Sequence, residues 1–149
     1  RMKRLDKTIE IIPELRETVQ GISAPQTWLV ITEGWCGDAA QIVPVLNKIA
    51  ELNSNIKLNF LLRDENLELM DQYLTNGRSR SIPKLVVLNE HNEELFNFGP
   101  RPAALQEMFY HLKANAMSND AVKEEIHKWY AKDKTISIQN DLLALLKDL

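Results

Sequence analysis

The sequence predicts an α/β domain of three layers, in which a four-stranded mixed sheet is flanked by helices. Short apolar runs bounded by turn formers indicate buried strands, and the segments between them repeat apolar residues at helical spacing. The elements follow the order strand, helix, strand and then helix, hairpin, helix, which is typical of a parallel βαβ unit followed by a β-hairpin and a covering helix. The 149 residues, 44% of them apolar and 26% charged, suit one soluble globular domain.

The chain opens with a short helix and a buried strand. The helix is expected over 13–20, because Pro13 suits a first turn and Gly21 follows as a stop signal. The run Trp28–Ile31 is short, continuous and rich in branched residues, which predicts a buried strand. A basic start precedes these elements, and we expect it to be a solvated chain end rather than a binding arm; it comprises Arg1, Lys3, Arg4 and Lys7.

A longer helix is expected from about residue 37 to 52. Pro44 lies inside it, removes one backbone donor and is expected to kink the helix axis. Its core face repeats at helical spacing through Ile42, Val45, Leu46 and Ile49. The elements that follow are a strand over 57–62, a short helix over 66–74, a loop over 77–81, a strand over 84–88, a turn over 90–93, a strand over 94–98 and a helix over 102–114.

The segment from about 118 to 149 predicts two more helices, each with an apolar stripe. Polar residues suited to helix N-caps occur at Ser118–Asp120 and at Ser137. The stripes need a partner surface, and we expect them to pack on the protein itself rather than at a subunit interface. The sequence thus predicts one domain with a core over about 26–114 and a helical C-terminal extension over about 118–149.

Charge and composition argue against several classes of partner. The net charge of −3 gives no general attraction to nucleic acid or anionic lipid. No apolar run approaches the roughly 18 residues of a membrane span, and no signal peptide is visible. His91, His111 and His127 lack ligand spacing, so we expect neither a metal nor a cofactor. The single cysteine fits a reducing compartment, which predicts a cytoplasmic protein.

That cysteine, Cys36, lies where the first predicted strand passes into the long helix. Unpaired backbone N–H groups and the helix dipole at such a position stabilise a thiolate. Gly37 lets the backbone pass close to the sulfur, and Trp35 offers a flat apolar wall to a partner. Asp38 opposes the thiolate by its charge, so we expect a pKa below that of a free cysteine but only moderately lowered. Alternatively, Cys36 is a small inert apolar residue.

A second feature is Ile82-Pro83, immediately before the strand over 84–88. Proline deletes a hydrogen bond of the sheet ladder, so it belongs at the first residue of a strand or at a bulge. A cis Ile82–Pro83 bond would leave the backbone of Ile82 free to pair with an extended substrate.

Taken together, these residues resemble the thioredoxin family over about residues 26–114. The resemblance implies the thioredoxin fold, with strand order 2-1-3-4, the third and fourth strands antiparallel to the first two, and a cis-proline against the cysteine. It rests on Trp35-Cys36-Gly37-Asp38 after a buried strand, Pro44 eight residues beyond the cysteine, Ile82-Pro83 before the third strand, and Gly99 after the fourth.

The sequence departs from the family pattern at two positions. Ala39 stands where the family has its second cysteine, and Val30 stands where it has a buried aspartate. Without a second thiol, nothing inside the chain can release a mixed disulfide formed at Cys36. The resemblance therefore implies an external resolving thiol, such as glutathione or another low-molecular-weight thiol. Loop arginines are candidates to hold its carboxylates, or are simply solvated; they are Arg78, Arg80 and Arg101.

The sequence leads to one main hypothesis and two alternatives. In the main one, the protein is a monothiol disulfide oxidoreductase that acts on a protein or peptide disulfide or thiol. In the second, it is a non-catalytic binding module that has lost redox activity, and in the third it is a subunit that assembles through its C-terminal helices. Cys36 is the predicted nucleophile; the predicted substrate-binding residues are Trp35, Gly37, Asp38, Ile82, Pro83 and Gly99.

Overall fold

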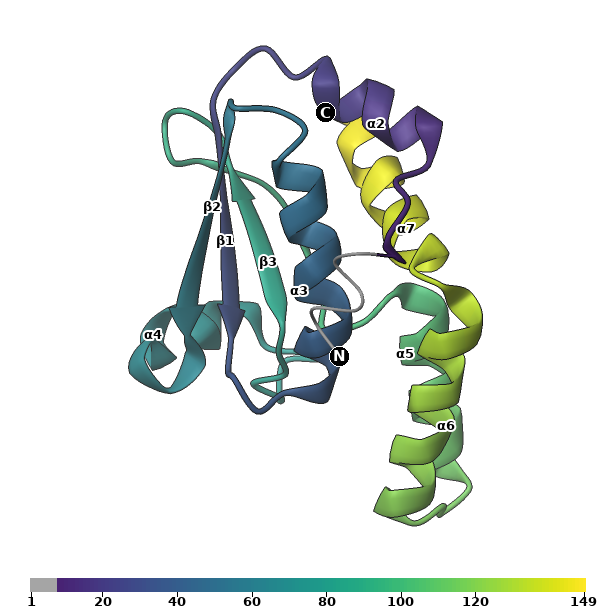
Figure 1. Cartoon of the computed structure of the whole chain (residues 1–149). Helices are drawn as coiled ribbons and strands as arrows, with labels where there is room; N and C mark the ends of the chain where they lie inside the picture. Colours follow the sequence, from purple (N-terminus) through teal and green to yellow (C-terminus); the bar gives the residue numbers. More distant parts are fainter. Residues whose placement is uncertain (1–7) are drawn as a thin grey trace.

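A four-stranded mixed sheet organises the structure, a computed structural model that describes residues 8–149 (Figure 1). The basic start at Arg1, Lys3, Arg4 and Lys7 lies outside the described residues. The strand order is β2-β1-β3-β4, with β1 parallel to β2 and antiparallel to β3, and β3 antiparallel to β4. This confirms the predicted order and directions. The strands are β1 (Gln26–Thr32), β2 (Ile56–Leu62), β3 (Lys84–Leu88) and β4 (Glu94–Phe98).

Most predicted helices are present, and one prediction was wrong. The helix expected over 66–74 is instead a single turn of α-helix between two 3-10 turns. At its start Asn66 has a non-helical backbone and its side chain donates to the Leu62 carbonyl, the local competition that keeps asparagine out of helix interiors. The helical elements are α2 (Pro13–Gln20), α3 (Gly37–Ala50), η1 (Arg63–Glu65), α4 (Leu67–Met70), η2 (Asp71–Tyr73), α5 (Ala103–Ala114), α6 (Asn119–Asp133) and α7 (Ile136–Lys147).

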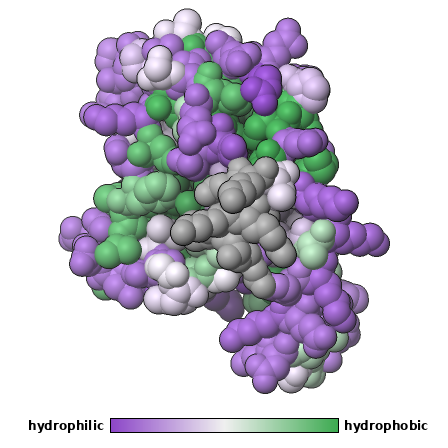
Figure 2. All heavy atoms as spheres, viewed as in Figure 1, coloured by the Kyte–Doolittle hydropathy of each residue, from purple (hydrophilic) through white to green (hydrophobic). Residues whose placement is uncertain are grey.

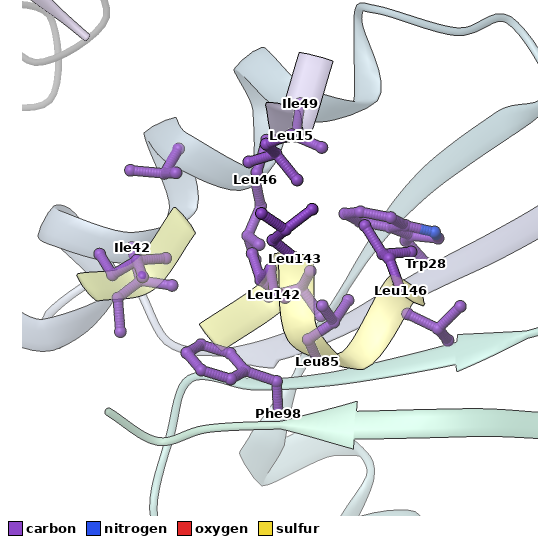
Figure 3. Packing of buried hydrophobic residues seen from close by; sticks show 14 of the residues in the cluster. Leu15, Trp28, Ile42, Leu46, Ile49, Leu85, Phe98, Leu142, Leu143 and Leu146 are labelled. Atoms are coloured by element: carbon purple, nitrogen blue, oxygen red, sulfur yellow. The ribbon is translucent and has the colours of Figure 1, made fainter. Parts of the chain in front are cut away.

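The two faces of the sheet pack against different elements. Successive side chains of a strand point to opposite faces, and on β1 the fully buried Trp28 and Val30 belong to the larger core, whereas Ile31 belongs to a smaller one. The larger core also contains side chains from α2, α3, α5 and α7, as Figure 3 shows for part of the cluster. The smaller core joins Ile31 to Met70 of α4 and to Ile82, and Cys36 packs at its edge.

The C-terminal helices belong to this packing. α7 lies against α2 and α3 (Figure 1), and its buried Gln139 donates to the Glu10 carbonyl at 2.9 Å and accepts from the Ile12 amide at 2.8 Å. Its apolar stripe thus packs on the protein itself, as expected. The free end of the α5–α6 pair projects beyond the sheet and is mostly hydrophilic on the face shown in Figure 2, so this face offers a partner little apolar surface.

One of the two predicted N-caps is correct. The Ser118 hydroxyl accepts from the Ala121 amide at 3.2 Å at the start of α6. Ser137 is not a cap, because α7 begins one residue before it, after Lys134 and Thr135 in left-handed conformations. The Asp133 carboxylate takes over this role, accepting from the Ser137 amide at 3.0 Å and from its hydroxyl at 2.6 Å.

Candidate functional site

Cys36 is the N-cap residue of α3, and its sulfur is held between two backbone groups. Sγ accepts from the Ala39 amide at 3.4 Å, so one of the unpaired N–H groups of the helix start points at it. On the other side the thiol donates to the Ile82 carbonyl, also at 3.4 Å. The residue is partly exposed. The expected position at a helix N-terminus is therefore present, and the thiol remains open to a small reactant.

The loop before β3 lies against this sulfur. The Ile82–Pro83 bond is cis, as the resemblance implied. Ile82 is only 6% exposed, and its carbonyl oxygen already accepts one hydrogen bond, from the Cys36 thiol. The Gly99–Pro100 bond is also cis, which no sequence signal had indicated.

Gly99 stands directly behind the Pro83 loop. Its φ is +122°, and a Cβ placed on it would lie 2.3 Å from the Pro83 carbonyl oxygen. The buried Lys84 links the same loops, because its Nζ donates to the Gly99 carbonyl at 2.9 Å. Burial lowers the Lys84 pKa, an effect that the nearby Glu94 carboxylate opposes. The absence of a side chain at Gly99 thus allows the two loops to lie close together, and Gly99 itself remains partly exposed.

Trp35 is the most exposed large apolar side chain of the site, with 68% of its surface accessible. The Arg63 guanidinium lies over its ring, 5.2 Å from the ring centroid, in the geometry of a cation–π contact. The same guanidinium pairs with Asp64 at 3.0 Å. The indole therefore stands at the rim of the site, with Arg63 beside it.

The Asp38 carboxylate is turned toward two residues of the C-terminal half of the chain. Arg101 forms a salt bridge with it at 3.1 Å, and the Tyr130 hydroxyl of α6 donates to it at 2.6 Å. Both charged side chains are largely buried, with 14% and 15% of their surfaces exposed. Arg101 is held in addition by Gln106, at 3.2 Å, and by the ring of Phe109, at 4.2 Å from its centroid. Helix α6 thereby reaches the first turn of α3, next to the nucleophile.

The structure corrects the expected pKa of Cys36, which is raised rather than lowered. Burial of the sulfur is the largest cause, and the charge of Asp38 adds to it. The backbone amides of Ala39 and Asp38 and the Arg101 guanidinium act in the opposite direction without outweighing burial. Burial and Asp38 likewise raise the pKa of Tyr130, which stays protonated and donates to the carboxylate.

A direct test is the pH dependence of Cys36 alkylation by iodoacetamide. The midpoint is expected above that of the same cysteine in the unfolded protein, because the raised pKa keeps the thiol protonated to higher pH. Asp38→Asn removes a negative charge and leaves Arg101 in place, so the midpoint is expected to fall. The thiolate fraction at neutral pH would rise roughly tenfold for each unit by which the pKa decreases, and the alkylation rate would rise with it, less steeply because a less basic thiolate is a weaker nucleophile.

Glu90→Gln is the control for that measurement, since Glu90 lies in the turn between β3 and β4, away from the sulfur. It removes the same charge and is expected to leave the midpoint unchanged. A midpoint of Asp38→Asn at or above that of the wild type would contradict the role assigned to the Asp38 charge.

The candidate arginines for a thiol tripeptide are mostly engaged. Arg101 pairs with Asp38, and Arg80 binds both carboxylate oxygens of Asp71, at 2.7 and 3.0 Å. Arg78 is exposed.

Within residues 8–149, no group of three or more His, Cys, Asp or Glu side chains is placed to hold a metal ion. None of the helices described is long and apolar enough to cross a membrane.

Comparison with known proteins identifies the family of the chain and its fold. A family model described as Thioredoxin matches residues 1–123. The crystal structure of a protein of unknown function from Pseudomonas aeruginosa superposes with a TM-score of 0.75 at 23% identity, covering 99% of this chain and 82% of the other. An HIV epitope scaffold gives a TM-score of 0.72 at 20% identity, with 99% and 83% covered. These identities support the fold alone. The comparison with curated proteins gave no match.

Proposed function

The chain belongs to the thioredoxin family, and on that premise we propose that Cys36 carries out thiol–disulfide exchange with a resolving thiol supplied by another molecule. The observation that carries the proposal is the sulfur itself, partly exposed at the N-terminus of α3 and accepting from the Ala39 amide. An anion at that position gains the partial positive charge of the helix start. The same amide belongs to the residue that replaces the family's second cysteine, so the chain holds no thiol that could resolve its own mixed disulfide.

The proposed reaction has two steps. The Cys36 thiolate attacks one sulfur of a substrate disulfide, forming a new S–S bond while the old one breaks, and the second substrate sulfur leaves as a thiolate that takes up a proton. An external thiol, as its thiolate, then attacks the substrate sulfur of the mixed disulfide and releases Cys36. The protein neither gains nor loses electrons over the cycle, since the external thiol takes the place of the departed substrate thiol. Because the cycle needs reduced thiols, we place the protein in the cytoplasm.

A second candidate is a non-catalytic thioredoxin-fold module that binds a peptide or protein. The raised pKa of Cys36 favours it, because only the thiolate attacks a disulfide and burial disfavours that form. For the exchange reaction the same fact predicts low activity at neutral pH and a rate that increases as the pH rises.

The two candidates differ in whether Cys36 forms an adduct. We expect a fluorescent peptide disulfide, mixed with excess low-molecular-weight thiol, to be reduced faster with the wild type than with Cys36→Ser, because the serine variant lacks the nucleophilic sulfur. Intact mass should show a peptide adduct on the wild type alone, and excess thiol should reverse it. Ala39→Cys is expected to release the adduct without added thiol. Equal turnover by wild type and Cys36→Ser, with no adduct, would leave the binding module as the function.

A further inference from the structure

An apolar pocket of about 320 Å³ opens beside Cys36, on the side of β2. It lies between the first turns of α3, the second half of β2 and the loop that joins β1 to α3. Of its lining residues, only Cys36 and Ala39 were singled out from the sequence. The pocket is lined by Thr32, Glu33, Gly34, Cys36, Ala39, Ala40, Val43, Phe60 and Leu62.

The β2 wall of the pocket is an apolar surface that no other element of residues 8–149 covers. Alternate residues of a strand share a face, so Ile56, Phe60 and Leu62 point the same way. Ile56, at the start of β2, is buried at 7% exposure, whereas Phe60 and Leu62 are 49% and 44% exposed. Adjacent exposed apolar side chains that line a concave site indicate binding of an apolar group.

The charges around the pocket favour an uncharged occupant. Glu33 is the charged residue in the lining, and it stays there because its carboxylate accepts from the Asp64 amide at 2.9 Å. Among residues 8–149, no lysine or arginine lines the pocket. The neighbouring guanidinium groups already have carboxylate partners, Arg63 with Asp64 and Arg101 with Asp38. From the part of the chain that the structure describes, a carboxylate entering the pocket would meet a like charge and no guanidinium without a carboxylate partner, which argues against an acidic thiol such as glutathione.

We propose that this pocket is a subsite for a large uncharged apolar side chain next to the reacting cysteine of a peptide or protein substrate. The proposal rests on the proposed function, since it is the sulfur in the pocket wall that brings the substrate there. The volume lies at the lower end of the roughly 300–1,000 Å³ of ligand pockets, which suits one large side chain. Cys36 thereby selects a hydrophobic peptide thiol or disulfide over an acidic low-molecular-weight one.

The test reacts the full chain with four disulfide-linked peptides. They differ only in the residue next to their cysteine, and that residue is Leu, Gly, Lys or Glu. The rate of mixed-disulfide formation on Cys36 is expected to be about tenfold higher for the leucine peptide than for the glycine peptide, and lowest for the glutamate peptide. The double variant Phe60→Ser, Leu62→Ser should abolish the leucine preference, and Glu33→Gln should raise the rate for the glutamate peptide. Leu149→Ser is the control, since this leucine is likewise exposed but lies far from the pocket, and the change is expected to leave all four rates unaltered.

Failure of the subsite is distinguishable from failure of the exchange reaction. If all peptides react with the wild type at one rate, the subsite is overturned while exchange stands. If no peptide reacts, the subsite is tested by binding alone: calorimetry measures the affinity of a leucine peptide in which serine replaces the cysteine. If the wild type binds this peptide and the double variant does not, the subsite is supported. If the two bind it equally, or neither binds it, the subsite is overturned. If the wild type is a dimer and the double variant is a monomer, a second copy of the chain occupies the pocket and the proposal is overturned. If deletion of residues 1–7 raises the peptide affinity tenfold, the chain's own start occupies the pocket and the proposal is likewise overturned.

Discussion

Gly99→Ala is expected to destabilise the protein by about 3 kcal/mol or more, the upper end of the range for a single strained backbone position. The φ of +122° is one that alanine rarely adopts, and its Cβ would lie 2.3 Å from the Pro83 carbonyl oxygen and 3.3 Å from the Lys84 Cα. Both neighbours are backbone atoms, so relief requires the loop before β3 to move. Urea denaturation monitored by circular dichroism would measure the loss.

The matched control is Gly37→Ala, at the first residue of α3. No atom of residues 8–149 outside its chain neighbours and the nearby backbone of its own helix lies within 4 Å of the Cβ that this change adds, and the φ of Gly37 is outside the left-handed range. Its effect should remain within about 0.5 kcal/mol. A Gly99→Ala variant as stable as the control would show that the two loops adjust freely, and would remove Gly99 from the residues that position the site.

Where local sequence signals mark both ends of an element, its first and last residues were predicted almost as the structure has them. α2 is bounded by Pro13 and Gly21, and β3 and β4 by Pro83, a polar turn and Gly99. In each case a residue that cannot continue the element stands at its end, so the boundary is fixed by chemistry within the segment itself. The short helix over 66–74 had no such boundary, and at its start the Asn66 side chain donates a hydrogen bond to the Leu62 carbonyl, which competes with helix formation.

The candidate site could be predicted only where it depends on neighbours in sequence. The cap position of Cys36 follows from the strand and helix boundaries, whereas its nearness to Ile82, 46 residues away, was expected only from the resemblance to the thioredoxin family. The hydrogen bond from Tyr130 to Asp38 spans 92 residues, and in the sequence Tyr130 is simply one member of an apolar stripe. The pKa of Cys36 depends on the surrounding volume that excludes water, which local sequence does not specify. The exposure of Phe60 and Leu62 likewise depends on what covers the edge strand.

Deletion of residues 134–149 is expected to unfold the protein, although the sequence predicted that region as part of an extension outside the core. α7 contributes four buried aliphatic side chains to the cluster that holds Trp28. Each is worth roughly 1.5–3 kcal/mol on burial, which together approaches the whole ~5–15 kcal/mol of stability of a typical domain. They are Ile138, Leu142, Leu143 and Leu146. Loss of the near-ultraviolet circular dichroism signal and of a cooperative urea transition would report the unfolding.

A point variant tests the same claim without removing chain. Leu142→Ala is expected to lose about 2–5 kcal/mol, because Leu142 is fully buried, whereas Ala144→Ser on the exposed side of α7 should be near neutral. The family match ends at residue 123 and α7 begins at Ile136, so the helix that completes the core and the Tyr130 that holds Asp38 both lie beyond the matched region. We therefore propose that residues 8–149 fold as one cooperative unit. A truncated chain that keeps a cooperative transition and a Leu142→Ala variant as stable as Ala144→Ser would instead make α7 a dispensable addition to a self-sufficient core.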